Sequence, residues 1–168
     1  MAYLIIIFAI LLVIGPVLWL QPSKQERQLA KLRQAAMADG AKIQPISIRK
    51  DPVYSATLAR NPHLDDHRWI RYQWVATENE SGPAVKETWV QRKDREQGLV
   101  WEPRQVTSKE PEEVTAMLAT WREHQDGRFL ALELGPRSVA IVWTEKTTPQ
   151  EVKELAEKIR RLFFTSKS

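Results

Sequence analysis

Apolar side chains fill the beginning of the chain, and no charge interrupts them. The run from Ala2 to Leu20 would form a helix of about 28 Å, close to the roughly 30 Å hydrocarbon core of a bilayer. A cleaved signal peptide has a basic start, a shorter apolar stretch and small residues at its end, and this run shows none of these. We therefore expect a transmembrane anchor over residues 1–21. A cleaved signal peptide and a buried core helix are the alternatives.

Residues 22–40 combine apolar positions at helical spacing with many basic ones. Ser23 and Glu26 match a capping box, in which two side chains satisfy free amides of the first turn, and Asp39-Gly40 would end the helix. The segment is predicted to be a basic juxtamembrane helix that serves as a stalk. Lying along the lipid surface and docking a partner are the alternatives.

Residues 41–168 alternate between strand-like and helix-like patterns. Strands are predicted at 41–49, 68–76, 85–92, 99–101, 129–134 and 137–144. Pro45 would place the first of them at a sheet edge. Helices are predicted from about Pro111 to Asp126 and from Pro149 onwards, whereas residues 50–67 show no sustained period and are expected to form an irregular connection.

The two later helices each carry an apolar stripe that would face a sheet. These stripes are Val114, Met117, Leu118 and Trp121 in the first helix, and Val152, Leu155, Ala156, Ile159, Leu162 and Phe163 in the second. The fold class is therefore α+β: one antiparallel sheet with helices packed on one face, following the N-terminal transmembrane helix.

Two stretches of the domain resemble each other. Val100-Trp101 precedes the helix at Pro111, and Val142-Trp143 precedes the helix at Pro149. The similarity is a hint of a repeated strand–strand–helix unit. The alternative is that any well-capped amphipathic helix looks this way.

Aromatic rings and positive charges flank the apolar run. Tyr3 and Trp19 fall near its two ends, where amphipathic rings suit the headgroup region. Basic side chains follow the run and none precedes it; they include Lys24, Arg27, Lys31 and Arg33. The positive-inside rule then places the N-terminus outside and the domain over residues 41–168 in the cytoplasm.

The inventory of reactive side chains argues against catalysis. The chain has no cysteine, three histidines and six glycines, and it contains neither a nucleophile elbow nor a glycine-rich phosphate loop. Its net charge of +4 is spread over the sequence, unlike the clustered charge of a nucleic-acid binder. We expect a protein that is not an enzyme and needs no cofactor, and nucleic acid is not an expected partner.

One segment offers ligands for a metal ion. His63 and His67 lie four residues apart with Asp65 and Asp66 between them. That spacing joins two histidines only on a helix, and Pro62 and the strand beginning near Arg68 leave little room for one. A polar loop is the expected reading, and a membrane-tethered metal-dependent enzyme is the alternative.

The seven tryptophans suggest a binding surface. Trp69 and Trp74 point to opposite faces of their predicted strand, so one face would present Trp69 with Arg71 and Gln73. Aromatic residues beside arginine are typical of protein interfaces. The favoured reading is that Trp69 belongs to the core or is covered by the 50–67 segment. The alternatives are the protein-binding surface, and a face that binds single-stranded nucleic acid or a small ligand.

The layout of the first 45 residues resembles a known family. An uncharged span, then Leu20-Gln21-Pro22-Ser23-Lys24-Gln25-Glu26-Arg27, a basic helix and Gly40-Ala41-Lys42-Ile43 resemble the YajC-type accessory subunit of the bacterial preprotein translocase. The layout also looks like that of uncharacterised bacterial single-pass inner-membrane proteins. The resemblance implies a cytoplasmic domain beside the translocation channel and no catalysis.

Together these features predict a single-pass protein of the bacterial inner membrane that is anchored in the bilayer by residues 2–20. Its cytoplasmic domain is expected to bind a protein partner at that membrane, as a non-catalytic accessory or scaffold protein that the resemblance links to protein translocation. The oligomeric state is left open.

Overall fold

The computed structural model describes residues 23–62, 64, 67–82, 86–94, 96, 98–105, 112–122 and 128–166, together with Tyr3 and Leu12. Apart from those two residues, the predicted anchor lies outside the described part. Within the described part, no helix combines the length and the apolar character that crossing a bilayer requires. The anchor over residues 1–21 therefore stays a prediction.

The predicted juxtamembrane helix is present as α2 (Lys24–Ala38). The Ser23 hydroxyl accepts a hydrogen bond from the Glu26 amide at 3.2 Å, and the Glu26 carboxylate accepts one from the Ser23 amide at 2.7 Å. The predicted capping box is thus confirmed. At the other end Gly40 adopts a φ of 80°, a left-handed conformation that glycine takes without strain and that turns the chain towards the sheet.

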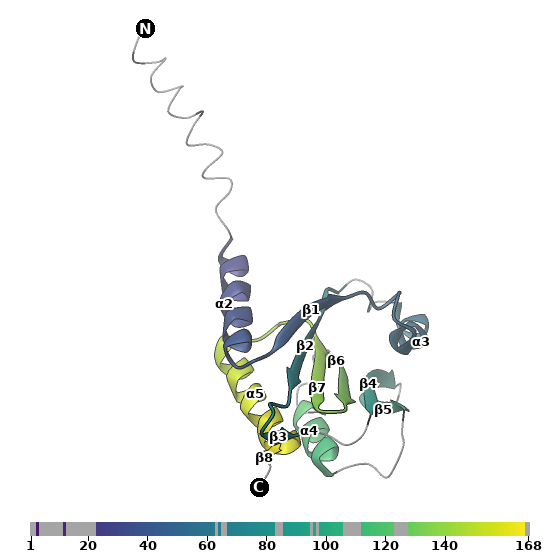
Figure 1. The fold of residues 1–168 in the computed structure, drawn as a ribbon. Helices are drawn as coiled ribbons and strands as arrows, with labels where there is room; N and C mark the ends of the chain where they lie inside the picture. The colour runs from purple at the N-terminus through teal and green to yellow at the C-terminus, as the bar shows by residue number, and fades with distance from the viewer. Residues whose placement is uncertain are drawn as a thin grey trace.

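A six-stranded antiparallel sheet forms the centre of the domain (Figure 1). Its strands are β1 (Lys42–Ile46), β2 (Trp69–Val75), β4 (Glu87–Asp94), β5 (Gly98–Gln105), β6 (Phe129–Gly135) and β7 (Ser138–Trp143). They are arranged in the order β1-β2-β7-β6-β4-β5, and β3 (Glu80–Ser81) pairs separately with β8 (Thr165–Ser166). The edge position predicted from Pro45 is confirmed, because among the described strands β1 is the outermost on its side and its neighbour is β2.

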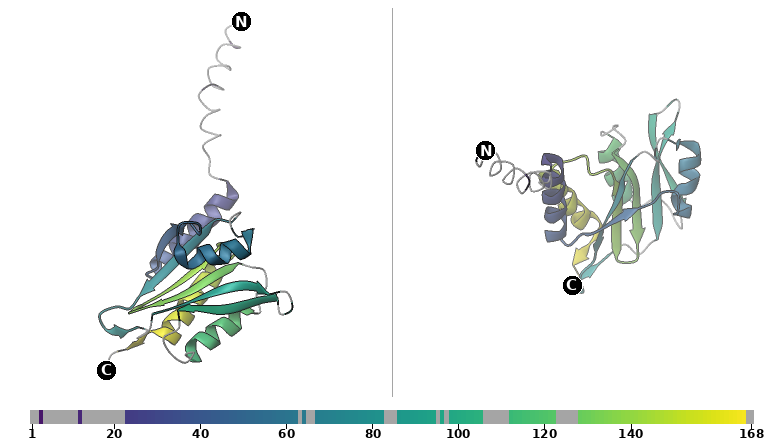
Figure 2. Two further views of the ribbon diagram at one scale, coloured as in Figure 1. Left: turned by 90° about the vertical axis from the view of Figure 1, so that its right-hand side faces the viewer. Right: turned by 90° about the horizontal axis from the view of Figure 1, so that it is seen from above.

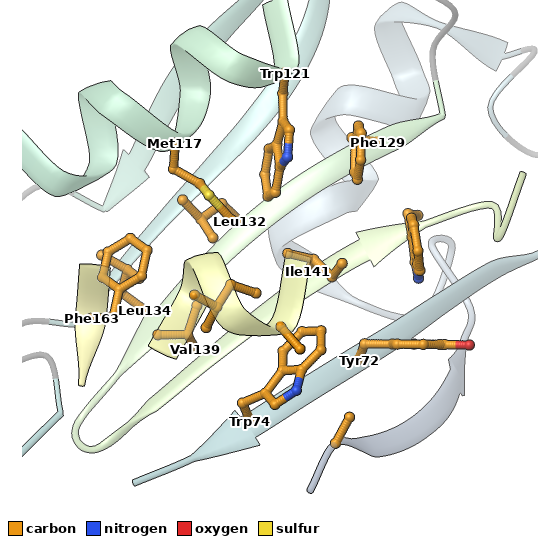
Figure 3. Close-up of a cluster of buried hydrophobic side chains, with 14 of the residues drawn as sticks. Tyr72, Trp74, Met117, Trp121, Phe129, Leu132, Leu134, Val139, Ile141 and Phe163 are labelled. Carbon is orange, nitrogen blue, oxygen red and sulfur yellow. The ribbon is translucent and has the colours of Figure 1, made fainter. Parts of the chain in front are cut away.

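Three helices cover one face of this sheet. They are α2, α4 (Glu112–Arg122) and α5 (Pro149–Phe163), and in Figure 1 α2 and α5 lie side by side. The predicted stripe of α4 is fully buried, and that of α5 is buried or half-buried. Side chains from the helices and strands interdigitate in a core rich in aromatic rings (Figure 3), which includes Tyr72, Trp74, Trp121, Phe129 and Trp143.

The opposite face is covered by a helix that the sequence pattern does not predict. Residues 50–67, expected to be irregular, include α3 (Pro52–Arg60), which begins where Asp51 Oδ1 accepts a hydrogen bond from the Val53 amide at 3.0 Å. Figure 2 shows α3 across the sheet from α2 and α5. The expectation of helices on one face only is therefore wrong. A helix of nine residues is too short for its period to stand out, and it buries mainly Tyr54 and Thr57.

The chain order strand–strand–helix occurs twice, as β4–β5–α4 and as β6–β7–α5. In each unit the two strands form an antiparallel pair, and Trp101 and Trp143 occupy the same core. The order of elements agrees with the repeat suggested by the sequence.

Candidate functional site

A hollow of about 760 Å³ lies beside α2. Three segments line it: the first turns of α2, the beginning of β2 at His67 and Arg68, and the connection between β7 and α5 at Thr144–Thr147. We call this hollow the α2 groove. Its size lies within the range of 300–1,000 Å³ that is typical of ligand sites.

A buried carboxylate closes the inner end of the groove. Glu145 Oε1 accepts hydrogen bonds from Arg33 Nε at 2.8 Å and from the Tyr72 hydroxyl at 2.6 Å, and its Oε2 accepts one from Arg33 Nη2 at 2.6 Å. The Glu145 side chain is 4% exposed, whereas that of Arg33 keeps 40%. Two parallel N–H···O bonds make this a bidentate pair, the strongest geometry that arginine forms with a carboxylate.

The environment of this cluster shifts its protonation equilibria. The hydrogen bonds to Glu145 raise the pKa of Arg33 above its usual value. Burial, and then the hydrogen bond to the same carboxylate, raise the pKa of Tyr72. Both groups therefore stay protonated at physiological pH, and the cluster is a fixed structural joint in that range.

The backbone of Glu145 is strained. Its φ of 58° lies in the left-handed region, which costs a non-glycine residue on the order of 1 kcal/mol or more. The strained conformation persists because it aims the carboxylate between Arg33 of α2 and Tyr72 of β2. The strained backbone of Glu145 is thus the local cost of joining α2 to the sheet.

A second contact fixes the other end of α2. Arg160 of α5 donates a hydrogen bond from Nη2 to the Asp39 carbonyl at 3.2 Å and forms an ion pair with Glu80 at 3.2 Å. Leu32, next to Arg33, and Ala36, between the two contacts, are buried against the core. Helix α2 is therefore attached to the domain along its C-terminal half, and its first turn is exposed on all sides.

Two cations of the groove are not engaged in this joint. Arg68 and Lys146 are both exposed, and neither side chain has a hydrogen bond or an ion pair with the part of the chain that the structure describes. His67 stands beside them at the rim, where its ring stacks on Trp69 with 5.8 Å between centroids. The groove thus presents positive charge to solvent.

The predicted partner-binding residues are buried or half-buried in the structure. Trp69 is 3% exposed, packs beneath α3 with Tyr54, and donates a hydrogen bond from Nε1 to the Leu64 carbonyl at 2.7 Å. Coverage by the 50–67 segment, the reading that the sequence favours, is therefore confirmed. Gln73 is half-buried, and Arg71 is half-buried within an ion-pair network.

That network is a feature that the sequence pattern does not reveal. Arg71 Nη2 lies 2.8 Å from Glu133 Oε1 and 3.6 Å from Asp51 Oδ2, and the Tyr54 hydroxyl donates a hydrogen bond to Glu133. Burial, and then the charge of Glu133, raise the pKa of Tyr54. Burial lowers the pKa of Arg71, but the charge of Glu133 and the hydrogen bonds outweigh that effect, so its pKa is raised. The network attaches α3 to the sheet.

The predicted metal ligands lie mostly outside the described residues. His63, Asp65 and Asp66 are not described, and His67 is exposed at the groove. Among the described residues, no group of three or more histidine or carboxylate side chains is arranged to hold a metal ion.

The residues predicted to flank the membrane differ in their exposure and in their contacts. Lys24, Arg27 and Lys31 are exposed on α2, and Tyr3 is exposed as well. Arg33 is not a free membrane-facing cation, because it is bound to Glu145. Trp19 lies outside the described residues.

A second hollow, of about 440 Å³, opens between α4 and α5. Trp121, Phe129 and Trp143 line it, and their rings stack on one another at 4.5 and 5.6 Å. Because these rings already cover one another's faces and are buried, this cleft offers less recognition chemistry than the α2 groove.

Comparisons with protein-family models, curated proteins and solved structures found no match for this chain.

Proposed function

We propose that the protein is a membrane-anchored, non-catalytic accessory or scaffold protein whose cytoplasmic domain binds a protein partner at the bacterial inner membrane. Protein translocation is the process that the layout of its N-terminal segment suggests. The observation that supports this proposal most strongly is the attachment of α2 to the sheet by hydrogen bonds within the Arg33–Glu145–Tyr72 cluster.

The locked helix limits where the domain can be. Ser23 follows Leu20, the last residue of the predicted span, by three positions, so their Cα atoms lie within about 11 Å of each other. With the anchor in the bilayer, the first turn of α2 stands at the headgroup layer, and the sheet follows the orientation of α2 because the two are joined. A tether of this kind raises the effective concentration of the domain for partners at the same membrane.

The partner surface is the part of the sheet that α3 leaves uncovered. Lys42 lies opposite Gln73 and Gln44 lies opposite Arg71, so these side chains share the face of Trp69. Lys42 and Gln44 are exposed, and Val75, at the end of the same row, is 38% exposed. Along β2, Arg71 of this surface lies three residues, or roughly 10 Å, beyond Arg68 of the α2 groove, and Val75 lies roughly 23 Å beyond it. The surface retains Arg71 and Gln73 of the predicted partner-binding set.

Photo-crosslinking in intact cells tests this proposal. A benzophenone amino acid replaces Gln44 on the proposed surface, and in a matched control it replaces Lys153, which is exposed on α5 across the sheet. We expect a protein adduct from position 44 and little from position 153. An adduct of twice the chain mass would identify a second copy as the occupant and overturn the hetero-partner, and equal yields at both positions would contradict the surface.

A further inference from the structure

We propose that the α2 groove binds the phosphate headgroups of anionic phospholipids, and so docks the domain on the inner leaflet. This inference rests on the proposed function for the position of the groove at the bilayer. It concerns a different surface from the one assigned to the protein partner.

The charges of the groove favour an anion. Its two carboxylates already serve internal bonds, Glu26 in the capping box and Glu145 in the joint with Arg33. Arg68 and Lys146 remain as exposed cations on the opposite wall. The charged side chains of the groove that make no internal bond are therefore cations. They complement the negative charge of a phosphodiester.

The topology brings these two cations together. Ile70 pairs with Trp143 in the antiparallel β2–β7 ladder, so Arg68, two positions earlier, and Lys146, three positions later, emerge at the same end of the sheet. This is also the end at which α2 begins, since the first turns of α2 form the other wall (Figure 1).

The surroundings extend the positive surface towards the bilayer. Lys24 and Lys31 are exposed on α2 within the stretch that directly follows the predicted span. With Arg27, Arg68 and Lys146 they make five basic side chains within reach of the headgroup layer. Basic clusters of four to eight residues next to a transmembrane helix bind anionic lipids. A lipid source is favoured over free phosphate because the tether keeps the groove at the leaflet.

Docking at the groove would give the domain a fixed orientation. The stalk and the groove would together hold one end of the sheet against the lipid, and the uncovered face at Lys42, Gln44 and Val75 would then stand away from the membrane. The lipid site thus complements the partner surface and does not compete with it.

Native mass spectrometry of the full chain in detergent micelles tests the lipid site. The probes are phosphatidylglycerol and phosphatidylcholine of matched chain length, added separately at equal concentration. We expect roughly tenfold greater retention of phosphatidylglycerol, lost in R68E/K146E, because each basic residue near a lipid surface contributes on the order of 1 kcal/mol. The matched control is K42E/R161E, which makes the same charge change at two exposed residues remote from the groove and should retain the lipid.

Three outcomes would overturn the lipid site: equal retention of the two lipids, no loss in R68E/K146E, or an equal loss in K42E/R161E. Displacement of the lipid by millimolar inorganic phosphate would assign the groove to a soluble anion and would also overturn it. The charge-neutral variant R68Q/K146Q should behave as R68E/K146E does, which guards against misfolding. Since micelles contain no partner, these results stand apart from the crosslinking at position 44, which can fail or succeed independently.

Discussion

The two faces of the sheet are stabilised in different ways. One face carries a continuous apolar core shared by α2, α4 and α5, with Trp74, Trp143 and Tyr72 among its largest buried side chains. The other carries a smaller cluster under α3, and beside that cluster lies the network of Tyr54, Glu133 and Arg71.

The difference shows which face limits the stability of the fold. Apolar burial contributes about 25 cal/mol for each Å² removed from water, so the larger core supplies most of the stabilisation. The face under α3 instead depends on a short helix and on directional bonds between charged groups. We expect damage to the first face to unfold the domain and damage to the second to release α3 locally.

Truncating a core tryptophan on the larger face should have the largest effect. The Trp143→Ala substitution removes a buried ring that contacts Tyr72 and Phe129, and we expect a loss of about 3–5 kcal/mol in the free energy of unfolding. Urea titration of the full chain in detergent measures it. Met37→Ala, at a side chain that is 56% exposed, is the control and should change stability by less than about 0.5 kcal/mol.

Trp69→Ala is the counterpart on the smaller face. Its loss should expose residues 52–60 to limited proteolysis while the circular dichroism of the sheet persists. If Trp69→Ala instead destabilises all elements equally, in a single cooperative transition, the two faces of the sheet unfold together. That result would contradict the proposed difference between them.

Substitution of the two carboxylates that pair with arginine should cause the next largest losses in the free energy of unfolding. Glu145→Gln removes the charge that pairs with Arg33, and we expect a loss of about 2–3 kcal/mol, below the 3–5 kcal/mol of a fully buried pair because Arg33 is partly exposed. Glu133→Gln should cost about 1–2 kcal/mol, since Glu133 and Arg71 are both more hydrated than Glu145. Equal losses in the two variants, measured by urea titration, would contradict the ranking.

Loss of a helix cap should reduce the free energy of unfolding by a smaller amount, which should be similar on the two faces of the sheet. Thr148→Ala removes the capping box of α5, and Asp51→Ala removes the cap of α3. Each should cost about 1 kcal/mol. For Thr148 the loss should appear in the global urea transition, whereas for Asp51 it should appear as faster amide exchange confined to α3. A global loss from Asp51→Ala would place α3 within the main cooperative unit.

The pH dependence of stability that arises from Tyr72 should be the smallest of these effects, and it should appear only at alkaline pH. Burial raises the pKa of Tyr72 above the value near 10 that an unfolded tyrosine has, so the folded state holds the phenol proton more tightly. The resulting stabilisation is fully present below about pH 10 and falls as the pH rises above it. The stability gap between the wild type and Tyr72→Phe should therefore narrow between pH 8 and pH 11. A gap that stays constant would contradict this assignment.

The features that local sequence predicts are those set by neighbouring residues. The cap at Ser23, the apolar stripes of α4 and α5, and the edge position of Pro45 all follow from spacing within one element. The opposite faces of Trp69 and Trp74 follow from strand alternation in the same way, and the two residues do fall in different clusters.

The features that local sequence does not predict depend on contacts between distant residues. Arg33 and Glu145 are 112 positions apart, so nothing near Arg33 distinguishes a structural cation from one that faces lipid. Arg68 and Lys146 meet only because β2 and β7 are neighbours in the sheet. The sequence pattern does not predict α3 because the helix has only nine residues and one of its two buried residues, Thr57, is polar.

The central claim is that α2 is joined rigidly to the sheet and that the proposed anchor holds the α2 groove at the lipid surface. The chain has no cysteine, so one introduced at exposed His67 beside the groove, or at exposed Lys42 at the other end of the sheet, can carry a unique fluorophore. In vesicles containing the full chain and headgroup spin-labelled lipid, we predict strong quenching at position 67 and weak quenching at position 42. Equal quenching at the two positions, or stronger quenching at position 42, would contradict the claim.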